Sequence, residues 1–136
     1  MANFRSAILK VLLTEGGYVN DKDDAGGETY KGIARKFWPQ WSGWVIIDLA
    51  KKQAGYESAL NRNMQLNDAV IAFYKLNFWD KVGGDFIDDQ EIGNNLVDSA
   101  VNEGIKSAVK RAQSIVGLSQ TGVVTPELVS KLNSMI

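Results

Sequence analysis

The sequence of 136 residues contains no histidine, no cysteine and only two prolines. Without histidine there is no Ser-His-Asp triad, no imidazole general base and no HExxH zinc site. Without cysteine there is no thiol nucleophile, no disulfide and no cysteine-ligated zinc or iron–sulfur cluster. Any catalysis by this chain therefore depends on carboxylates, hydroxyls, lysines or backbone donors, and carboxylates are the first candidates.

The sequence also lacks a basic charge balance and long apolar runs. The formal net charge is -1, which gives no overall basic footprint for nucleic acid. The longest apolar runs are far shorter than the ~20 residues that a membrane-spanning helix needs, so no stable membrane insertion is expected. Near the N-terminus, Lys10 interrupts the apolar stretch that follows Arg5, and no small-x-small cleavage site follows. We expect synthesis in the cytoplasm and a separate route for any export.

The spacing of apolar residues predicts a mainly α-helical fold with no strand. A chain of this length buries enough surface for one core, so a single compact domain is expected. Thr29 is predicted to cap a short helix, Asp88 and Glu91 have the spacing of a capping box, and Thr125-Pro126 is a strong helix start. The predicted helices cover about residues 3–15, 30–37, 45–54, 67–79, 88–104, 105–116 and 125–135.

Glu15 stands at the end of the first predicted helix. It follows Leu12 by three positions and Val11 by four, so it extends the apolar face, where burial disfavours a charged carboxylate. The negative end of the helix dipole disfavours that charge as well. Both effects raise a carboxyl pKa, as a general acid requires. The alternative is that Glu15 turns outward and is simply hydrated.

The loop after Glu15 has the sequence GGYVNDKDDAGGE, with three aspartates and four glycines in a short connection. Such a loop is costly for stability, and departures of this kind are typical of functional sites. Asp21, Asp23 and Gly26 match the first, third and sixth positions of an EF-hand loop. Ala25 and Gly32 stand where the fifth and twelfth ligands belong, so no calcium site is predicted. Neither GxGxxG nor GxxxxGK[ST] occurs, and no cofactor is expected.

Two segments of the chain resemble one known family. Residues 15–21 (EGGYVND) and 24–33 (DAGGETYKGI) look like the signature of glycoside hydrolase family 108. This family consists of N-acetylmuramidases with a lysozyme-like helical fold, found among phage endolysins and secretion-associated muramidases. The second half is similar to the predicted peptidoglycan-binding segment that usually follows, in Phe78-Trp79-Asp80, in residues 96–104 and in Ala112-Gln113.

The resemblance implies a catalytic muramidase region over residues 1–66 and a helical peptidoglycan-binding region over residues 67–136, packed against it. The implied reaction is hydrolysis of the β-1,4 bond between N-acetylmuramic acid and N-acetylglucosamine. Glu15 is then the catalytic acid. Asp24 is the first choice for the second carboxylate, with Asp21 and Asp23 as rivals. Tyr18, Thr29 and Tyr30 are the expected substrate-binding residues.

The sequence is also compatible with two other functions, that of a lytic transglycosylase and that of a non-catalytic wall-binding module. The expected partners are the glycan strands of peptidoglycan and, for export, a holin or a secretion apparatus. A phage or prophage endolysin and a secretion-associated muramidase both fit the sequence. Either would act on the cell wall in the periplasm or outside the cell.

Two apolar patterns have both a structural and a functional interpretation. Trp38, Trp41 and Trp44 are spaced by three and offer sugar-stacking surfaces, but core packing is favoured for Trp38, Trp44 and Trp79. The stripe over residues 105–116 (Ile105, Ala108, Val109, Ala112, Ile115 and Val116) is also predicted to be core. Its opposite face carries Lys106, Lys110 and Arg111, a basic edge that is hypothesised to attract anionic wall polymers.

Overall fold

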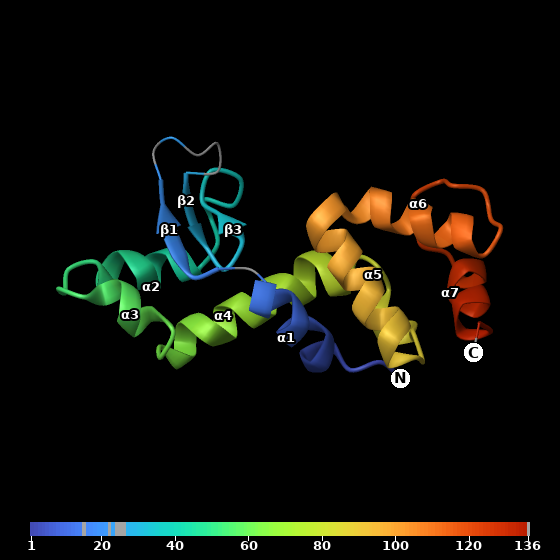
Figure 1. Ribbon diagram of the computed structural model, residues 1–136, viewed down its shortest axis with the longest axis horizontal. Coiled ribbons are helices and arrows are strands. Elements are labelled where there is room, and N and C mark those ends of the chain that lie inside the picture. Colours follow the sequence, from blue (N-terminus) through green and yellow to red (C-terminus); the bar gives the residue numbers. More distant parts are fainter. Residues whose placement is uncertain (15, 22, 24–26, 136) are drawn as a thin grey trace. The chain divides into compact units, whose positions relative to one another are not determined.

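The computed structural model describes residues 1–14, 16–21, 23 and 27–135, which form mostly helices and one small sheet (Figure 1). The chain divides into two compact units, Leu12–Phe73 and the combination of Met1–Val11 with Tyr74–Ile136. Each unit has its own core. The predicted mainly α-helical class is confirmed, whereas the expectation that no strand forms is wrong. Glu15 and Asp24 lie outside the described residues.

The unit Leu12–Phe73 contains a three-stranded antiparallel sheet in the order β1 (Tyr18–Asn20), β2 (Glu28–Tyr30) and β3 (Ile33–Ala34). The predicted helix over residues 30–37 is wrong, and Thr29 is the middle residue of β2 rather than a helix cap. The cause is the two-residue turn between β2 and β3. Lys31 and Gly32 have φ of 46° and 82°, the left-handed region that reverses a tight hairpin.

Three helices complete this unit: α2 (Gly43–Ala50), α3 (Tyr56–Leu60) and α4 (Met64–Tyr74), whose last residue belongs to the other unit. The helix predicted over residues 45–54 forms but ends early, and α3 was not predicted. The helix expected to open at Asn67 begins earlier because Asn63 Oδ1 accepts the Leu66 N–H at 2.9 Å. The core of the unit consists of buried aromatic and aliphatic side chains, including Tyr30, Ile33, Trp44, Ile47, Leu60, Leu66 and Val70.

The second unit contains most of α1 (Phe4–Thr14), the π-helical turn η1 (Lys75–Trp79), the 3₁₀ turn η2 (Gly84–Phe86), α5 (Gln90–Glu103), α6 (Ile105–Ile115) and α7 (Pro126–Asn133). Asp89, not Asp88, caps α5, since its Oδ2 accepts the Ile92 N–H at 3.0 Å. The predicted cap of the last helix is confirmed, because Thr125 Oγ1 accepts the Leu128 N–H at 3.2 Å.

Trp79 is fully buried in this second unit, as the core prediction required. Its indole N–H donates to Asp85 Oδ1 at 2.7 Å, and its ring centroid lies 5.6 Å from that of Phe4. Two glycines make room for the indole. A Cβ at Gly84 would lie 2.2 Å from the ring, and one at Gly93 would lie 3.2 Å from it. The Trp79 ring therefore packs in space that side chains at Gly84 and Gly93 would otherwise occupy.

The stripe on α6 is only partly core. Ala108, Val109 and Ala112 are buried as predicted, but the prediction is wrong for Ile115, which is 62% exposed. Gln113, a buried polar side chain, donates to Thr121 Oγ1 and Val123 O and accepts the Gly122 N–H at 2.9 Å. These bonds fix the loop that leads from α6 to α7 (Figure 1).

Candidate active site

The register of the sheet separates the three residues predicted to bind substrate. Tyr18 lies opposite Tyr30 and Val19 lies opposite Thr29. Because side chains alternate along a strand and directly opposed residues share a face, Tyr18 and Tyr30 project to one side of the sheet and Thr29 to the other. The sheet therefore brings the two tyrosines together and places Thr29 on the opposite face.

The two tyrosines differ in their accessibility. Tyr30 is fully buried, its hydroxyl donates to Asn61 Oδ1 at 3.4 Å, and burial raises its pKa. In this position its side chain offers no surface to a ligand. Tyr18 and Thr29 are partly exposed. The ring of Tyr18 is held edge-on against Tyr56, with the centroids 5.7 Å apart.

Glu28, the first residue of β2, collects three donors on its carboxylate. The Tyr18 hydroxyl and the Lys51 ammonium both donate to Oε2, the former at 2.6 Å. Arg35 Nη1 donates to Oε1 at 3.0 Å. The Glu28 side chain is only 13% exposed. This carboxylate therefore connects β1, β2, the residue after β3 and the residue after α2.

Asp48 on α2 completes what we call the charged cluster, which consists of Glu28, Arg35, Asp48 and Lys51. Arg35 binds Asp48 through two parallel bonds of 2.8 and 2.7 Å, the geometry that suits a guanidinium and a carboxylate. Lys51 Nζ lies 3.5 Å from Asp48 Oδ1. Two cations and two anions balance in charge. Sequence reasoning missed the cluster, because its only local signal is the i,i+3 spacing of Asp48 and Lys51.

The pKa values in the cluster follow from these contacts. Burial, the largest effect, raises the pKa of Glu28, but the hydrogen bonds from Lys51, Tyr18 and Arg35 outweigh it and leave that pKa below its usual 4.5. The hydrogen bonds from Arg35 lower the pKa of Asp48 to about 2. Burial and the bond to Glu28 raise the pKa of Tyr18 to about 12. Glu28 is therefore held ionised, which is unsuited to a general acid at neutral pH.

Asp21 and Asp23 lie in the connection between β1 and β2, and both are exposed. The Asp23 N–H donates to Asp21 Oδ1 at 2.9 Å, a local turn in which the side chain takes the place of a backbone acceptor. The structure thus gives the Asp21 carboxylate a turn-forming role. The two residues assigned to catalysis from the sequence, Glu15 and Asp24, lie outside the described residues.

The aromatic side chains after β3 are more exposed than expected. Trp44 is 2% exposed, which confirms its core assignment, but Trp38 is 38% exposed, which the core prediction did not anticipate. The Trp38 ring is fixed edge-on against Phe73, with the centroids 4.8 Å apart. Its neighbour Phe37, not singled out from the sequence, is 69% exposed.

Neither a metal site nor a membrane span is found in the part of the chain that the structure describes. Within residues 1–14, 16–21, 23 and 27–135, no three histidine, cysteine or acidic side chains are grouped to hold a metal ion. Among the described helices, none is both long and apolar enough to cross a bilayer.

Comparison with models of known protein families assigns this chain to a family. The family model for glycosyl hydrolase 108 matches residues 8–104. The chain belongs to glycosyl hydrolase family 108. This match contains the whole sheet, the charged cluster and helices α2 to α5. No curated protein sequence shows a significant match.

A solved structure agrees with the family assignment. The structure of Brucella abortus SagA is similar to this chain, with a TM-score of 0.66 and 27% sequence identity, over 98% of this chain and 70% of that one. The mainly α-helical, lysozyme-like fold expected from the resemblance is thereby confirmed. Family 108 membership supports a glycoside hydrolase function directed at peptidoglycan.

Proposed function

We propose that this family 108 chain is an N-acetylmuramidase that hydrolyses the β-1,4 bond between N-acetylmuramic acid and N-acetylglucosamine. One observation carries the proposal: the family match runs through the helix–hairpin segment in which α1 ends at Thr14 and β1 begins at Tyr18. Glu15 follows α1 directly in the chain. The acidic residues of the loop lie between β1 and β2.

Glu15 is the proposed general acid, which protonates the leaving glycosidic oxygen as the bond breaks toward an oxocarbenium-like state. The contacts of Glu28, the other glutamate of the same motif, support this choice. Glu28 carries three hydrogen bonds and a lowered pKa, so it is committed to structure rather than to proton donation.

Asp24 is the proposed second carboxylate, which positions water or stabilises the cation. Asp21 is the weaker rival because its Oδ1 already accepts the Asp23 N–H, and Asp23 is the remaining alternative. The separation of the two carboxyl groups determines the stereochemistry, with about 5–5.5 Å giving retention and roughly 6.5–9.5 Å giving inversion. Tyr18 and Thr29, both partly exposed on the hairpin, are proposed to border the bound glycan.

The remaining assignments belong to the same proposal. Residues 1–66 form the catalytic region and residues 67–136 the wall-binding region. The protein is made in the cytoplasm and reaches the wall through a holin or a secretion apparatus, as an endolysin or a secretion-associated muramidase. Lysis of host cells only when a holin is co-expressed would support the first role, and lysis without a holin would contradict it.

The test is hydrolysis of purified peptidoglycan by wild type and by Glu15→Gln. We expect the variant to lose activity by about 10²–10⁴-fold, the range of general acid catalysis, with an unchanged circular dichroism spectrum. Glu57→Gln, at an exposed glutamate on α3, is the matched control and should remain fully active. Near wild-type clearing by Glu15→Gln would refute the assignment.

Two further measurements define the chemistry. Asp24→Asn should lose activity by a smaller factor than Glu15→Gln, and a larger loss in Asp23→Asn or Asp21→Asn would move the second role there. Mass spectrometry of the wild-type products should show reducing-end N-acetylmuramic acid. A 1,6-anhydro sugar would mean a lytic transglycosylase instead, and binding without any product would mean a non-catalytic wall-binding module.

A further inference from the structure

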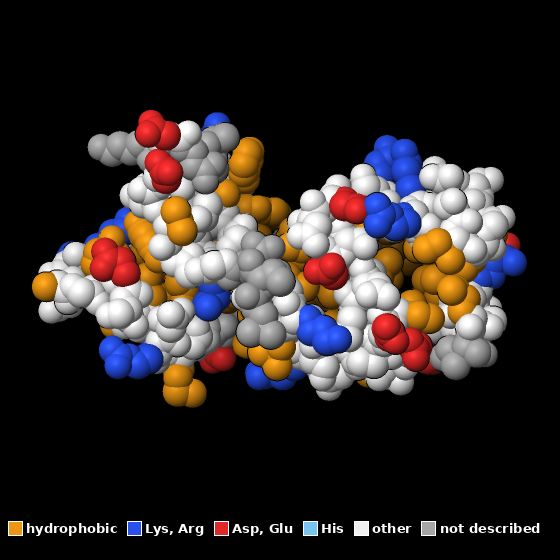
Figure 2. Space-filling view, in the orientation of Figure 1, with side chains coloured by type: hydrophobic (Ala, Val, Ile, Leu, Met, Phe, Trp, Pro, Cys, Tyr) orange, Lys and Arg blue, Asp and Glu red, His pale blue; other side chains and the backbone are white. Residues whose placement is uncertain are grey.

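Helices α5, α6 and α7 enclose a hollow of about 360 Å³. Its floor is aliphatic and buried, formed by Leu96, Ala108, Ala112 and Leu132, each between 2% and 7% exposed. The hollow opens over α6 because two of these side chains are alanines, one helical turn apart. Figure 2 shows hydrophobic side chains gathered in a depression beside these three helices. The volume is within the range of small-ligand sites.

The rim of this hollow combines apolar and charged groups. Ile115 and Met135 remain 62% and 52% exposed although they border the buried floor. Asp98 on α5 and Arg111 on α6 also line the hollow and carry opposite charges. Arg111 Nη2 donates to Glu103 Oε1 at 2.5 Å, yet its side chain is still 58% exposed. Donors of the guanidinium therefore remain accessible to a ligand.

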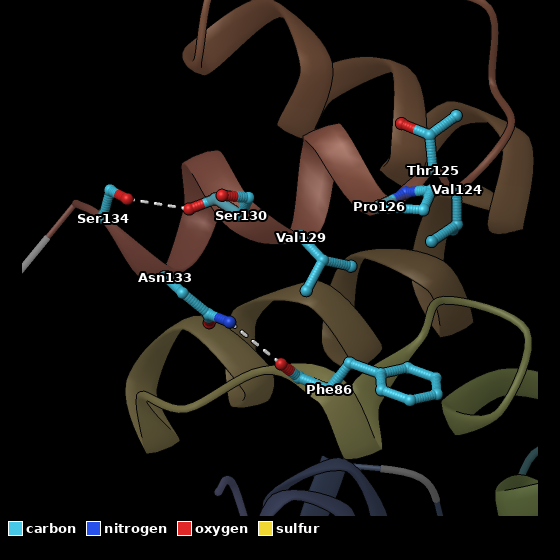
Figure 3. A pocket seen from close by; sticks show the side chains of 8 residues that line it. All are labelled: Phe86, Val124, Thr125, Pro126, Val129, Ser130, Asn133 and Ser134. Atoms are coloured by element: carbon cyan, nitrogen blue, oxygen red, sulfur yellow. Dashed lines mark hydrogen bonds between the residues drawn. The ribbon is translucent and has the colours of Figure 1, made fainter.

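A second hollow in the same unit shows what is distinctive about the first. It measures about 720 Å³ and lies between η2 and α7 (Figure 3). No charged side chain is among the described residues that line it. Its polar groups bond to the protein itself, since Asn133 Nδ2 donates to Phe86 O at 3.0 Å and Ser134 Oγ to Ser130 O at 2.9 Å. The first hollow, unlike this second one, thus pairs an aliphatic floor with charges of both signs.

We propose that the hollow between α5, α6 and α7 binds the peptide stem of peptidoglycan. A stem peptide carries alanine methyl groups, free carboxylates and, on its third residue, a side-chain amine. The aliphatic floor takes the methyl groups, Arg111 a carboxylate and Asp98 the ammonium. Sugar sites usually present aromatic rings, and no aromatic side chain is among the described residues lining this hollow, so the charge pattern favours the peptide over the glycan.

The inference rests on the proposed wall substrate but not on the catalytic step. The first experiment therefore uses a synthetic stem tetrapeptide, which has no glycosidic bond, and measures its binding to the wild-type protein by calorimetry. Arg111→Gln should weaken binding about ten-fold, the loss expected for one charge-assisted hydrogen bond. Lys110→Gln is the matched control, because it removes a positive charge at the preceding position of α6, and Lys110 does not line the hollow. This variant should bind the tetrapeptide like wild type.

The amine contact has its own test. Acetylating the side-chain amine of the tetrapeptide should weaken binding to the wild type, and Asp98→Asn should then cause no further loss, because both changes remove the same pair. No measurable binding of the tetrapeptide to the wild type would overturn the proposal. Equal affinities of Arg111→Gln and Lys110→Gln would overturn it too.

A second experiment separates this site from catalysis. On intact peptidoglycan, Arg111→Gln should raise KM and leave kcat unchanged; on glycan strands stripped of their peptides by an amidase, it should match wild type in both. An equal rise of KM on the stripped strands would mean that the hollow binds glycan and would refute the peptide assignment. If the wild type hydrolyses neither substrate, the muramidase proposal fails, while calorimetry still decides the peptide site.

Discussion

Replacing Glu28 by glutamine should destabilise the unit Leu12–Phe73. Glutamine keeps the length of the side chain and one acceptor oxygen. Its NH₂ group, however, would face the Tyr18 hydroxyl and the Lys51 ammonium, or else Arg35, all of which are donors to Glu28 in the structure. The substitution therefore replaces an attractive contact by two donors directed at each other.

The expected loss of stability in Glu28→Gln depends on how far the partners of Glu28 are exposed to solvent. Hydrogen bonds to a charged group contribute about 1.5–3 kcal/mol each when buried. The Arg35 and Lys51 side chains are 35% and 31% exposed, so solvent screens part of their attraction to Glu28. Both also keep Asp48 as a partner. We expect a net loss of about 2 kcal/mol in the free energy of unfolding, or roughly 6–10 °C in Tm for a chain of this size.

The assay is thermal and urea unfolding followed by circular dichroism, with Glu57→Gln as the control for the loss of one exposed carboxylate in the same unit. A double-mutant cycle of Glu28→Gln with Lys51→Met isolates the pair energy. A variant Glu28→Gln that melts within about 1 °C of the control would mean that solvent competes fully with these bonds. The cluster would then not be what fixes the hairpin to α2.

Two further predictions concern packing and pH. Gly84→Ala should lower the free energy of unfolding by about 3 kcal/mol or more, because its Cβ would lie 2.2 Å from the buried Trp79 ring. Gly17→Ala, with open space around the new Cβ, should change the free energy of unfolding by less than about 0.5 kcal/mol. Similar urea midpoints for the two variants would contradict this prediction. Tyr18 has a folded pKa of about 12, above its usual 10, so its contribution is complete below pH 10 and is lost as the pH rises toward 12. Tyr18→Phe should therefore show a shallower loss of stability between pH 10 and 12 than wild type, and identical pH profiles would contradict the raised pKa of Tyr18.

Most of the predicted helices form, but the helix over residues 30–37 does not, α3 was not predicted, and two helix starts were placed at the wrong residue. Thr125 was identified as a cap because proline at the next position leaves little freedom. The starts at Asn63 and Asp89 were each missed in favour of a nearby residue of the same kind. Several residues that are able to cap stand close together at both places. Which of these residues caps the helix depends on which backbone N–H groups lie within reach of its side chain, and tertiary packing determines that position.

The sheet was not predictable from periodicity for a different reason. Its strands have three, three and two residues, too short to show alternation. Lys31 occupies a left-handed turn position that asparagine or glycine usually fills, so the hairpin signal was missing from the sequence. With no hairpin recognised, Thr29 looked like a helix cap. Its true place in β2 also puts its side chain on the other face of the sheet from Tyr18 and Tyr30, which no spacing argument shows.

The absence of histidine and cysteine made carboxylates the candidates for catalysis, and the end of the first helix together with the family motif singled out Glu15 among them. The structure adds which of the other carboxylates are already bound to partners. Glu28 and Asp48 are held ionised by Arg35 and Lys51, and Asp21 accepts a backbone N–H in its own loop. The lowered pKa values of Glu28 and Asp48 make them unsuited to proton donation, and Asp21 has one of its oxygens engaged in a turn. Among the acidic residues of the family motif, these contacts argue against Glu28 as the proton donor and make Asp21 a weaker candidate for the second carboxylate. The comparison of Asp24→Asn with Asp23→Asn and Asp21→Asn is therefore the experiment that assigns the second role.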